Sequence, residues 1–149
     1  RENQGPGGNS KLRERRELAM AVKTIALIAH DSCKSALVEW CRSNKDKLSR
    51  YNLWATGTTG AVVSAQTGLA VRRALSGPLG GDLQIGSKIV GGEIDILIFF
   101  WDPLASQPHD PDIKALLRVA ALKNIPVATN QATADFLIAS PLLDGEIGG

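Results

Sequence analysis

The run "IDILIFF", residues 94–100, decides the fold class that this sequence predicts. It is short, nearly all apolar and rich in Ile and Phe, which is typical of a strand covered on both faces. A comparable run, "TIALIAH", occupies residues 24–30, and shorter ones occupy residues 51–56, 70–75 and 125–129. We therefore expect five strands in one buried sheet.

Segments with helical spacing follow each expected strand. In residues 31–48 the apolar side chains recur on one helical face, and Asp31 or Ser32 is the expected N-cap. The other expected helices span residues 58–68, 82–92, 111–124 and 131–140. This alternation predicts the α/β class: a single-domain, open, parallel five-stranded sheet with helices on both faces, a Rossmann-like arrangement.

The length and composition fit one globular domain. The chain has 149 residues, of which 44% are apolar and 21% charged, values ordinary for a domain that buries its own core. Residues 1–23 hold six Lys or Arg and three Asp or Glu, a net +3, so the rest of this +2 chain carries −1. The remainder therefore lacks the excess of positive charge that a nucleic-acid-binding domain usually carries. We expect residues 1–20 to form a flexible basic tail or a short charged helix, followed by a domain over residues 21–149.

The cysteines and the hydropathy predict a cytoplasmic protein with no membrane partner. Cys33 and Cys41 are eight residues apart, about two helical turns, which is too far to bridge along one helix. We expect both to be free thiols, as in a reducing compartment. The sequence shows no apolar run of the ~18 residues that span a bilayer, and no signal-peptide pattern.

Polar residues follow every expected strand. In a parallel sheet these loops gather at the carboxyl ends of the strands, which is where ligands bind. In chain order the loops supply His30, Asp31 and Lys34; Thr56, Gly57, Thr58, Thr59 and Gly60; Ser76, Gly77, Pro78, Gly80, Gly81 and Asp82; Asp102, His109, Asp110 and Asp112; and Thr129 and Asn130. Both histidines of the chain lie on this one edge, which random placement would rarely produce.

Two glycine-containing loops leave alternatives open. The loop "TGTTG", residues 56–60, opens a helix whose free amides and dipole suit a phosphate, with Lys34 as its counter-charge. A simple capped helix start explains the same loop equally well, and the loop matches neither a Walker A motif nor GxGxxG. In "SGPLGGD", residues 76–82, turn chemistry explains the glycines, and an N-cap role is the simpler explanation of Asp82 when the loop is considered alone.

The fourth loop, "FFWDPLASQPHDPD" at residues 99–112, is stiffened by three prolines. Asp110, before Pro111, is the expected N-cap of the next helix. Asp102, His109 and Asp112 are then left without a structural role. A metal site is not favoured, because no helix places two histidines four residues apart and the cysteine spacing does not help.

Six motifs together resemble methylglyoxal synthase, over residues 24–141. They are "AHDSCK", "WATGTTG", "LSGPLGGD", "DILIFFWDPL", "HDPDIKALLRVA" and "NIPVATNQATADF". The resemblance implies conversion of dihydroxyacetone phosphate to methylglyoxal and inorganic phosphate, with no cofactor, by a homohexamer that inorganic phosphate inhibits. It assigns Asp82 as the base, with His30, Asp102, His109 and Asp112 as further catalytic positions. It assigns phosphate binding to Lys34, Thr56, Gly57, Thr58, Thr59, Ser76 and Gly77.

The residues fit this chemistry independently of the resemblance. Removing a proton beside a carbonyl requires a positioned base and an electrophile on the carbonyl oxygen. Asp82 suits the first role, and His109, alone or with His30, suits the second. Asp102 and Asp112 suit proton carriers or residues that orient the histidines.

The alternative function is a regulatory domain of the same fold that binds a phosphorylated effector. Such a domain needs a phosphate loop, but it has no need for Asp82, His109 and Asp112 together.

The sequence departs from the family pattern at Asp31, which pairs with a C-terminal basic residue in the family. The ending "LLDGEIGG" departs from the family's ending and contains no such residue.

Overall fold

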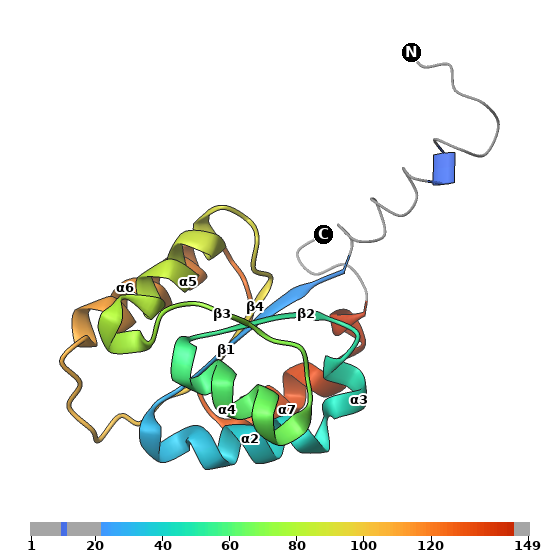
Figure 1. Ribbon diagram of the computed structural model, residues 1–149. Coiled ribbons are helices and arrows are strands. Elements are labelled where there is room, and N and C mark those ends of the chain that lie inside the picture. Colours follow the sequence, from blue (N-terminus) through green and yellow to red (C-terminus); the bar gives the residue numbers. More distant parts are fainter. Residues whose placement is uncertain (1–9, 12–21, 145–149) are drawn as a thin grey trace.

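Five strands form the expected parallel sheet, in the order β3-β2-β1-β4-β5 (Figure 1). The computed structural model describes residues 10–11 and 22–144. The strands are β1 (Thr24–Ala29), β2 (Asn52–Ala55), β3 (Arg72–Arg73), β4 (Ile96–Phe100) and β5 (Val127–Ala128). Every neighbouring pair is parallel, so the predicted fold class is confirmed.

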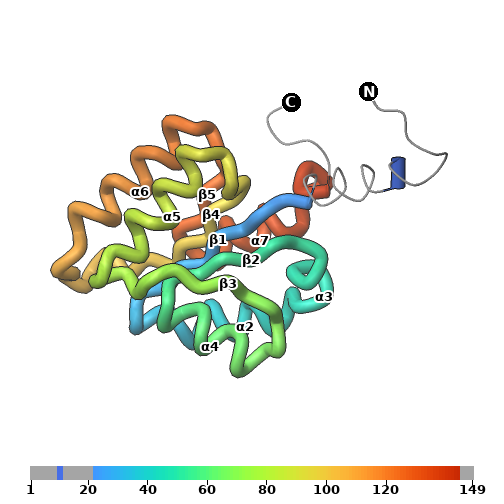
Figure 2. The backbone as a smooth tube through the Cα atoms, turned by 45° about the horizontal axis from the view of Figure 1, so that its top comes forward, coloured from blue at the N-terminus to red at the C-terminus, as the bar shows by residue number. Residues whose placement is uncertain are grey.

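Helices cover both faces of this sheet. They are α2 (Lys34–Ser43), α3 (Lys45–Leu48), α4 (Gly57–Thr67), α5 (Gly81–Val90), α6 (Asp110–Leu122) and α7 (Gln131–Ala139). Short 3-10 turns are η1 (Asp31–Cys33), η2 (Gly77–Leu79) and η3 (Pro141–Leu143). Figure 2 shows α5 and α6 on one face, with α2 and α4 on the other, and Figure 1 shows α7 beside α2 and α4.

The central strand β1 supplies side chains to both halves of the core. Ile25 and Leu27 pack with α2, α4 and α7, whereas Ala26 and Ile28 pack with α5 and α6. This alternation follows from the two-residue side-chain period of a strand. All six residues of β1 are buried, which explains why its sequence is continuously apolar.

The edge strands are shorter than the sequence predicted. The runs at 70–75 and 125–129 reduce to two paired residues each, and both residues of β3 are exposed. Each of these strands has only one neighbour in the sheet, so fewer of its residues are held by ladder hydrogen bonds. The exposed arginines also suit an edge, because charged side chains discourage pairing with another strand.

The expected helix over residues 31–48 divides into η1, α2 and α3, with a break at Asn44. The predicted caps are also wrong at two helices. His30, rather than Asp31 or Ser32, holds the N-cap position of η1, and His109, rather than Asp110, holds that of α6. Asp110 is the first residue of α6, where a carboxylate still interacts favourably with the helix dipole.

Both thiols are free, as predicted, and Cys41 is fully buried. Burial raises the pKa of Cys41 to about 12. No helix in the described ranges is long and apolar enough to cross a membrane. The predicted tail at residues 1–20 lies outside the described residues except for 10–11, which are helical.

Candidate active site

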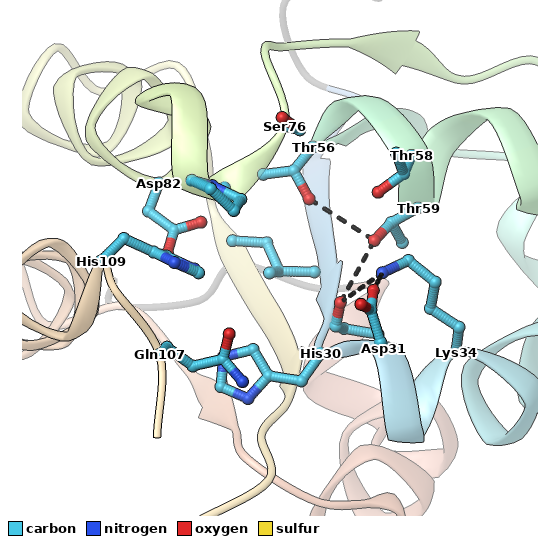
Figure 3. A pocket seen from close by; sticks show the side chains of 14 residues that line it. His30, Asp31, Lys34, Thr56, Thr58, Thr59, Ser76, Asp82, Gln107 and His109 are labelled. Atoms are coloured by element: carbon cyan, nitrogen blue, oxygen red, sulfur yellow. Dashed lines mark hydrogen bonds and ion pairs between the residues drawn. The ribbon is translucent and has the colours of Figure 1, made fainter. Parts of the chain in front are cut away.

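A cavity of about 220 Å³ opens at the carboxyl ends of the strands (Figure 3). That is smaller than the roughly 300–1,000 Å³ of sites for drug-sized ligands, so it suits a compound of a few carbons. Its lining residues are Ile28, Ala29, His30, Asp31, Lys34, Thr56, Thr58, Thr59, Ser76, Gly77, Pro78, Asp82, Gln107 and His109. Figure 3 separates an aspartate end (His30, Asp82, Gln107 and His109) from a threonine end (Lys34, Thr56, Thr58 and Thr59).

Asp82 is a buried carboxylate without a hydrogen-bond partner. It is the second residue of α5, whose N-cap position belongs to Gly80, so the alternative that Asp82 caps the helix is wrong. Its side chain is 1% exposed and neither carboxylate oxygen is hydrogen-bonded. Burial raises the pKa of Asp82, and the charge of Asp112 adds to this rise, whereas His109 opposes it. A carboxylate held this way binds a proton more readily than an ordinary one.

His109 lies beside Asp82. The distance from His109 Nε2 to Asp82 Oδ2 is 3.6 Å, and the other ring nitrogen, Nδ1, is buried without a partner. Gly77 makes this approach possible, because a Cβ atom there would lie 2.9 Å from His109 Nε2 and 3.3 Å from Asp82 Oδ1. The glycine loop thus leaves room for the histidine and the carboxylate to meet.

His30 has a defined orientation and tautomer at the end of β1. The backbone amide of Asp102 donates to His30 Nδ1 at 3.0 Å. An amide is only a donor here, so Nδ1 is unprotonated and Nε2 carries the hydrogen of the neutral ring. Burial lowers the pKa of His30, and the nearby His109 lowers it further. A neutral ring therefore presents its Nε2–H, which is buried and has no partner in the protein.

The threonine end surrounds the start of α4. Thr56 holds the N-cap position, but its side chain makes no capping bond, which removes the simple capping explanation of "TGTTG". Its hydroxyl contacts that of Thr59 at 3.5 Å, and the Thr59 hydroxyl donates to the Ala29 carbonyl at 3.4 Å. The first amides of a helix have no carbonyl partner within it and attract anions.

Lys34 completes the threonine end. Its Nζ lies 2.5 Å from Asp31 Oδ1 and 3.4 Å from the Ala29 carbonyl oxygen. The Asp31 side chain is 99% exposed, so it can release Lys34 to a more strongly charged ligand at little cost. The sequence offered no C-terminal partner for Asp31, and among the described residues Asp31 pairs with Lys34 instead. This pairing lowers the pKa of Asp31.

Nine of the twelve predicted site residues line the cavity, and Gly57, Asp102 and Asp112 do not. Gly57 instead joins two loops: its amide donates to the Leu75 carbonyl at 3.1 Å, and a Cβ there would meet Ser76 N at 3.1 Å. Asp112 lies in the first turn of α6 and acts on Asp82 through its charge.

The expectation that Asp102 has no structural role is wrong. Its carboxylate accepts hydrogen bonds from the Ser32 hydroxyl at 2.6 Å and from the Leu104 amide at 3.0 Å. Because Ser32 lies 70 residues away in the sequence, no local pattern could have revealed this contact.

Gln107 is the polar lining residue that the sequence interpretation missed. It is half-buried and lies on the same side of the cavity as His109 (Figure 3). The available signal was its place in the proline-stiffened loop, two residues before His109. Within residues 10–11 and 22–144, no group of three or more His, Cys, Asp or Glu residues is arranged to hold a metal ion.

Comparisons with known proteins agree on one family. Residues 36–129 match the model of the family described as "MGS-like domain". Methylglyoxal synthase of Vibrio parahaemolyticus is 59% identical over 127 residues, 85% of this chain and 84% of the relative. That of Proteus mirabilis is 63% identical over 124 residues, 83% of this chain and 82% of the relative. The crystal structure of methylglyoxal synthase from Elizabethkingia anophelis superimposes with a TM-score of 0.79 at 51% identity, covering 83% of this chain and 82% of that one.

Proposed function

This chain belongs to the methylglyoxal synthase family, and from that premise we propose how its cavity carries out the reaction. The chain is a lyase that converts dihydroxyacetone phosphate to methylglyoxal and inorganic phosphate. The observation that carries the proposed mechanism is the buried, unpartnered carboxylate of Asp82 at one end of a cavity whose other end suits a phosphate.

The phosphate of the substrate binds at the threonine end. Lys34 supplies the positive charge, and the amides that follow Gly57 at the start of α4 supply donors with the favourable sign of the helix dipole. Ser76 and Gly77 also line the cavity, and Gly77 lies against His109 and Asp82. This orientation directs the carbonyl and the hydroxymethyl carbon towards Asp82, His30 and His109.

Asp82 removes a proton from the hydroxymethyl carbon. The electron pair of that C–H bond forms the carbon–carbon double bond of the enediolate, and negative charge develops on the carbonyl oxygen. The Nε2–H of neutral His30 donates to that oxygen, which lowers the energy of the transition state. Asp112 assists from outside the cavity, because its charge raises the pKa of Asp82 and makes it a stronger base.

Elimination follows from the enediolate. The electron pair of the enediol O–H bond forms the aldehyde C=O, the carbon–carbon double bond shifts towards the phosphate-bearing carbon, and the bond from that carbon to the phosphate oxygen breaks with its electron pair leaving on phosphate. Lys34 and the start of α4 stabilise that leaving charge. The enediol hydroxyl loses its proton as the aldehyde forms, and His109, whose Nδ1 has no partner, is placed to accept it. The resulting enolate gains on its terminal carbon the proton that Asp82 removed, which gives methylglyoxal and restores the charged carboxylate.

The alternative, a regulatory domain that binds a phosphorylated effector, is not favoured. It would use the threonine end alone. It offers no reason to bury Asp82 without a hydrogen bond, an arrangement that costs stability. That cost is understandable at a site where the carboxylate must exchange a proton.

Three further properties belong to this proposal. Assembly as a homohexamer and inhibition by inorganic phosphate follow from the family resemblance, and location in the cytoplasm follows from the cysteines and the hydropathy. Light scattering of the purified chain tests the first. Inhibition of turnover by added phosphate, competing with substrate for the threonine end, tests the second. A dimer or monomer of full activity would contradict the hexamer.

The direct test follows both products at once. The purified chain is incubated with dihydroxyacetone phosphate in the presence of a chelator, and methylglyoxal and phosphate are measured against the spontaneous rate. Equal release of both supports the proposal. Phosphate without methylglyoxal indicates simple hydrolysis, and release of neither, with phosphate still bound, indicates the regulatory alternative.

A further inference from the structure

A chain of hydrogen bonds outside the cavity ends on His30. The Ser32 hydroxyl donates to Asp102 Oδ2 at 2.6 Å, and the Asp102 backbone amide donates to His30 Nδ1 at 3.0 Å. We propose that Ser32 and Asp102 form a positioning pair that holds His30 in the tautomer with its hydrogen on Nε2. The inference rests on the proposed function in one respect, which is the role of His30 as the electrophile.

The tautomer matters because only one of the two neutral forms can donate into the cavity. With the hydrogen on Nε2, the ring donates to the oxygen on which negative charge develops. With the hydrogen on Nδ1, Nε2 would turn a lone pair towards that same charge. The imidazole itself has no strong preference, so the partner of Nδ1 decides the tautomer. That partner is the Asp102 amide.

The Asp102 amide in turn depends on how its loop is held. Asp102 follows the end of β4 and precedes a loop without regular structure. Its carboxylate is fixed from both sides, by the Ser32 hydroxyl from the loop after β1 and by the Leu104 amide at 3.0 Å. Ser32 therefore ties the loop after β4 to the loop that carries His30.

Two further observations support the pair. Neither Ser32 nor Asp102 lines the cavity, so their effect must pass through His30 rather than through contact with substrate. The hydrogen bond from Ser32 is also the largest cause of the lowered pKa of Asp102, which indicates that the hydroxyl favours the charged carboxylate.

The first test compares Ser32→Ala with Ser32→Thr, which keeps the hydroxyl, and with Ser49→Ala as a matched control. Ser49 is an exposed serine whose hydroxyl donates to the Asp46 carbonyl, away from the site. Nitrogen NMR of the imidazole rings in the labelled full chain reports the tautomer directly, without substrate. Only two histidines contribute, so the spectrum is simple.

We expect wild type and both controls to show His30 protonated on Nε2 alone. Ser32→Ala should show a mixture of tautomers, and its kcat should fall by about 10-fold, the effect of losing one hydrogen bond to a charged group. KM and the inhibition constant for inorganic phosphate should change little, because the threonine end is intact. Asp102→Ala should produce the same pattern with a larger loss.

An unchanged His30 tautomer in both Ser32→Ala and Asp102→Ala would overturn the proposal, and so would an equal loss of kcat in Ser32→Thr. If the wild-type chain does not turn over dihydroxyacetone phosphate, the proposed function fails. The NMR comparison still shows whether Ser32 and Asp102 hold the His30 tautomer. The two failures are therefore distinguishable.

Discussion

The two ends of the cavity differ in whether their polar groups have hydrogen-bond partners. At the threonine end, the Thr56 and Thr59 hydroxyls and the Lys34 ammonium all contact protein oxygens. At the aspartate end, His30 Nε2, His109 Nδ1 and both carboxylate oxygens of Asp82 are buried without partners. Throughout the described residues these four are the only buried side-chain nitrogen or oxygen atoms without a hydrogen bond.

This difference reflects two kinds of chemistry. A phosphate brings its own charge and can displace weak contacts such as the exposed Lys34–Asp31 pair, so the threonine end can stay satisfied when empty. A base and an electrophile must keep their reactive atoms available, so the aspartate end carries the energetic cost of unsatisfied groups. Activity and stability should therefore oppose each other at the aspartate end and not at the threonine end.

The largest effect is expected for Asp82→Asn. This change removes the base, and kcat should fall by about 10²–10⁴-fold, the usual contribution of a general base. Because the folded chain raises the pKa of Asp82, the charged carboxylate opposes folding at neutral pH, and this opposition disappears as the pH falls through the raised pKa. Asp82→Asn should therefore raise Tm at pH 7, by about 2–4 °C per kcal/mol gained.

Calorimetry and steady-state kinetics on the same preparation measure both quantities. Asp46→Asn is the matched control, since Asp46 is an exposed residue of α3, and it should change neither. Near-normal turnover in Asp82→Asn would show that the base lies elsewhere.

Lys34→Met should act on the other end. It removes a charge-assisted hydrogen bond to the phosphate, and kcat/KM should fall by about 10–100-fold, with a weaker inhibition by inorganic phosphate. No gain in Tm is expected, because Lys34 is already paired. Lys47→Met is the control, since Lys47 donates to the Ile138 carbonyl away from the cavity. Unchanged kinetics would place the phosphate outside the threonine end.

The pH dependence should report the aspartate end alone. Turnover requires Asp82 charged and His30 neutral, and both conditions are lost on acidification. Burial raises the pKa of Asp82 above 3.8, so the acid limb of kcat/KM should lie above that of an ordinary aspartate. Rates measured across about pH 4–8 test this, and a kcat/KM that stays constant down to the lowest of these pH values would contradict the raised pKa of Asp82.

The smallest effect is expected for Gln107→Leu. Gln107 lies at the aspartate end, where its amide can bind the substrate hydroxyl, and Leu preserves the volume without the hydrogen bond. The loss in kcat/KM should be about 2–10-fold, the value of one neutral hydrogen bond. Gln131→Leu, at an exposed position of α7, should have no effect. Equal kcat/KM values for the two variants would show that Gln107 does not bind the substrate.

The sequence by itself determined the sheet and the edge on which the site lies. The largely apolar runs at residues 24–30 and 94–100 became the buried strands β1 and β4, because a strand covered on both faces is apolar at nearly every position. The alternation with helices then required a parallel sheet. The loops that follow the strands had to meet at one edge, which brought His30, Asp82 and His109 together.

Only the tertiary structure decided what each polar residue does there. It left Asp82 without a hydrogen bond, placed Asp112 outside the cavity and paired Asp102 with Ser32 across 70 residues of sequence. The physical reason is the separation in sequence of the residues that contact one another. Periodicity and turn chemistry encode contacts over a few residues, whereas the environment of a side chain depends on how distant loops pack around it.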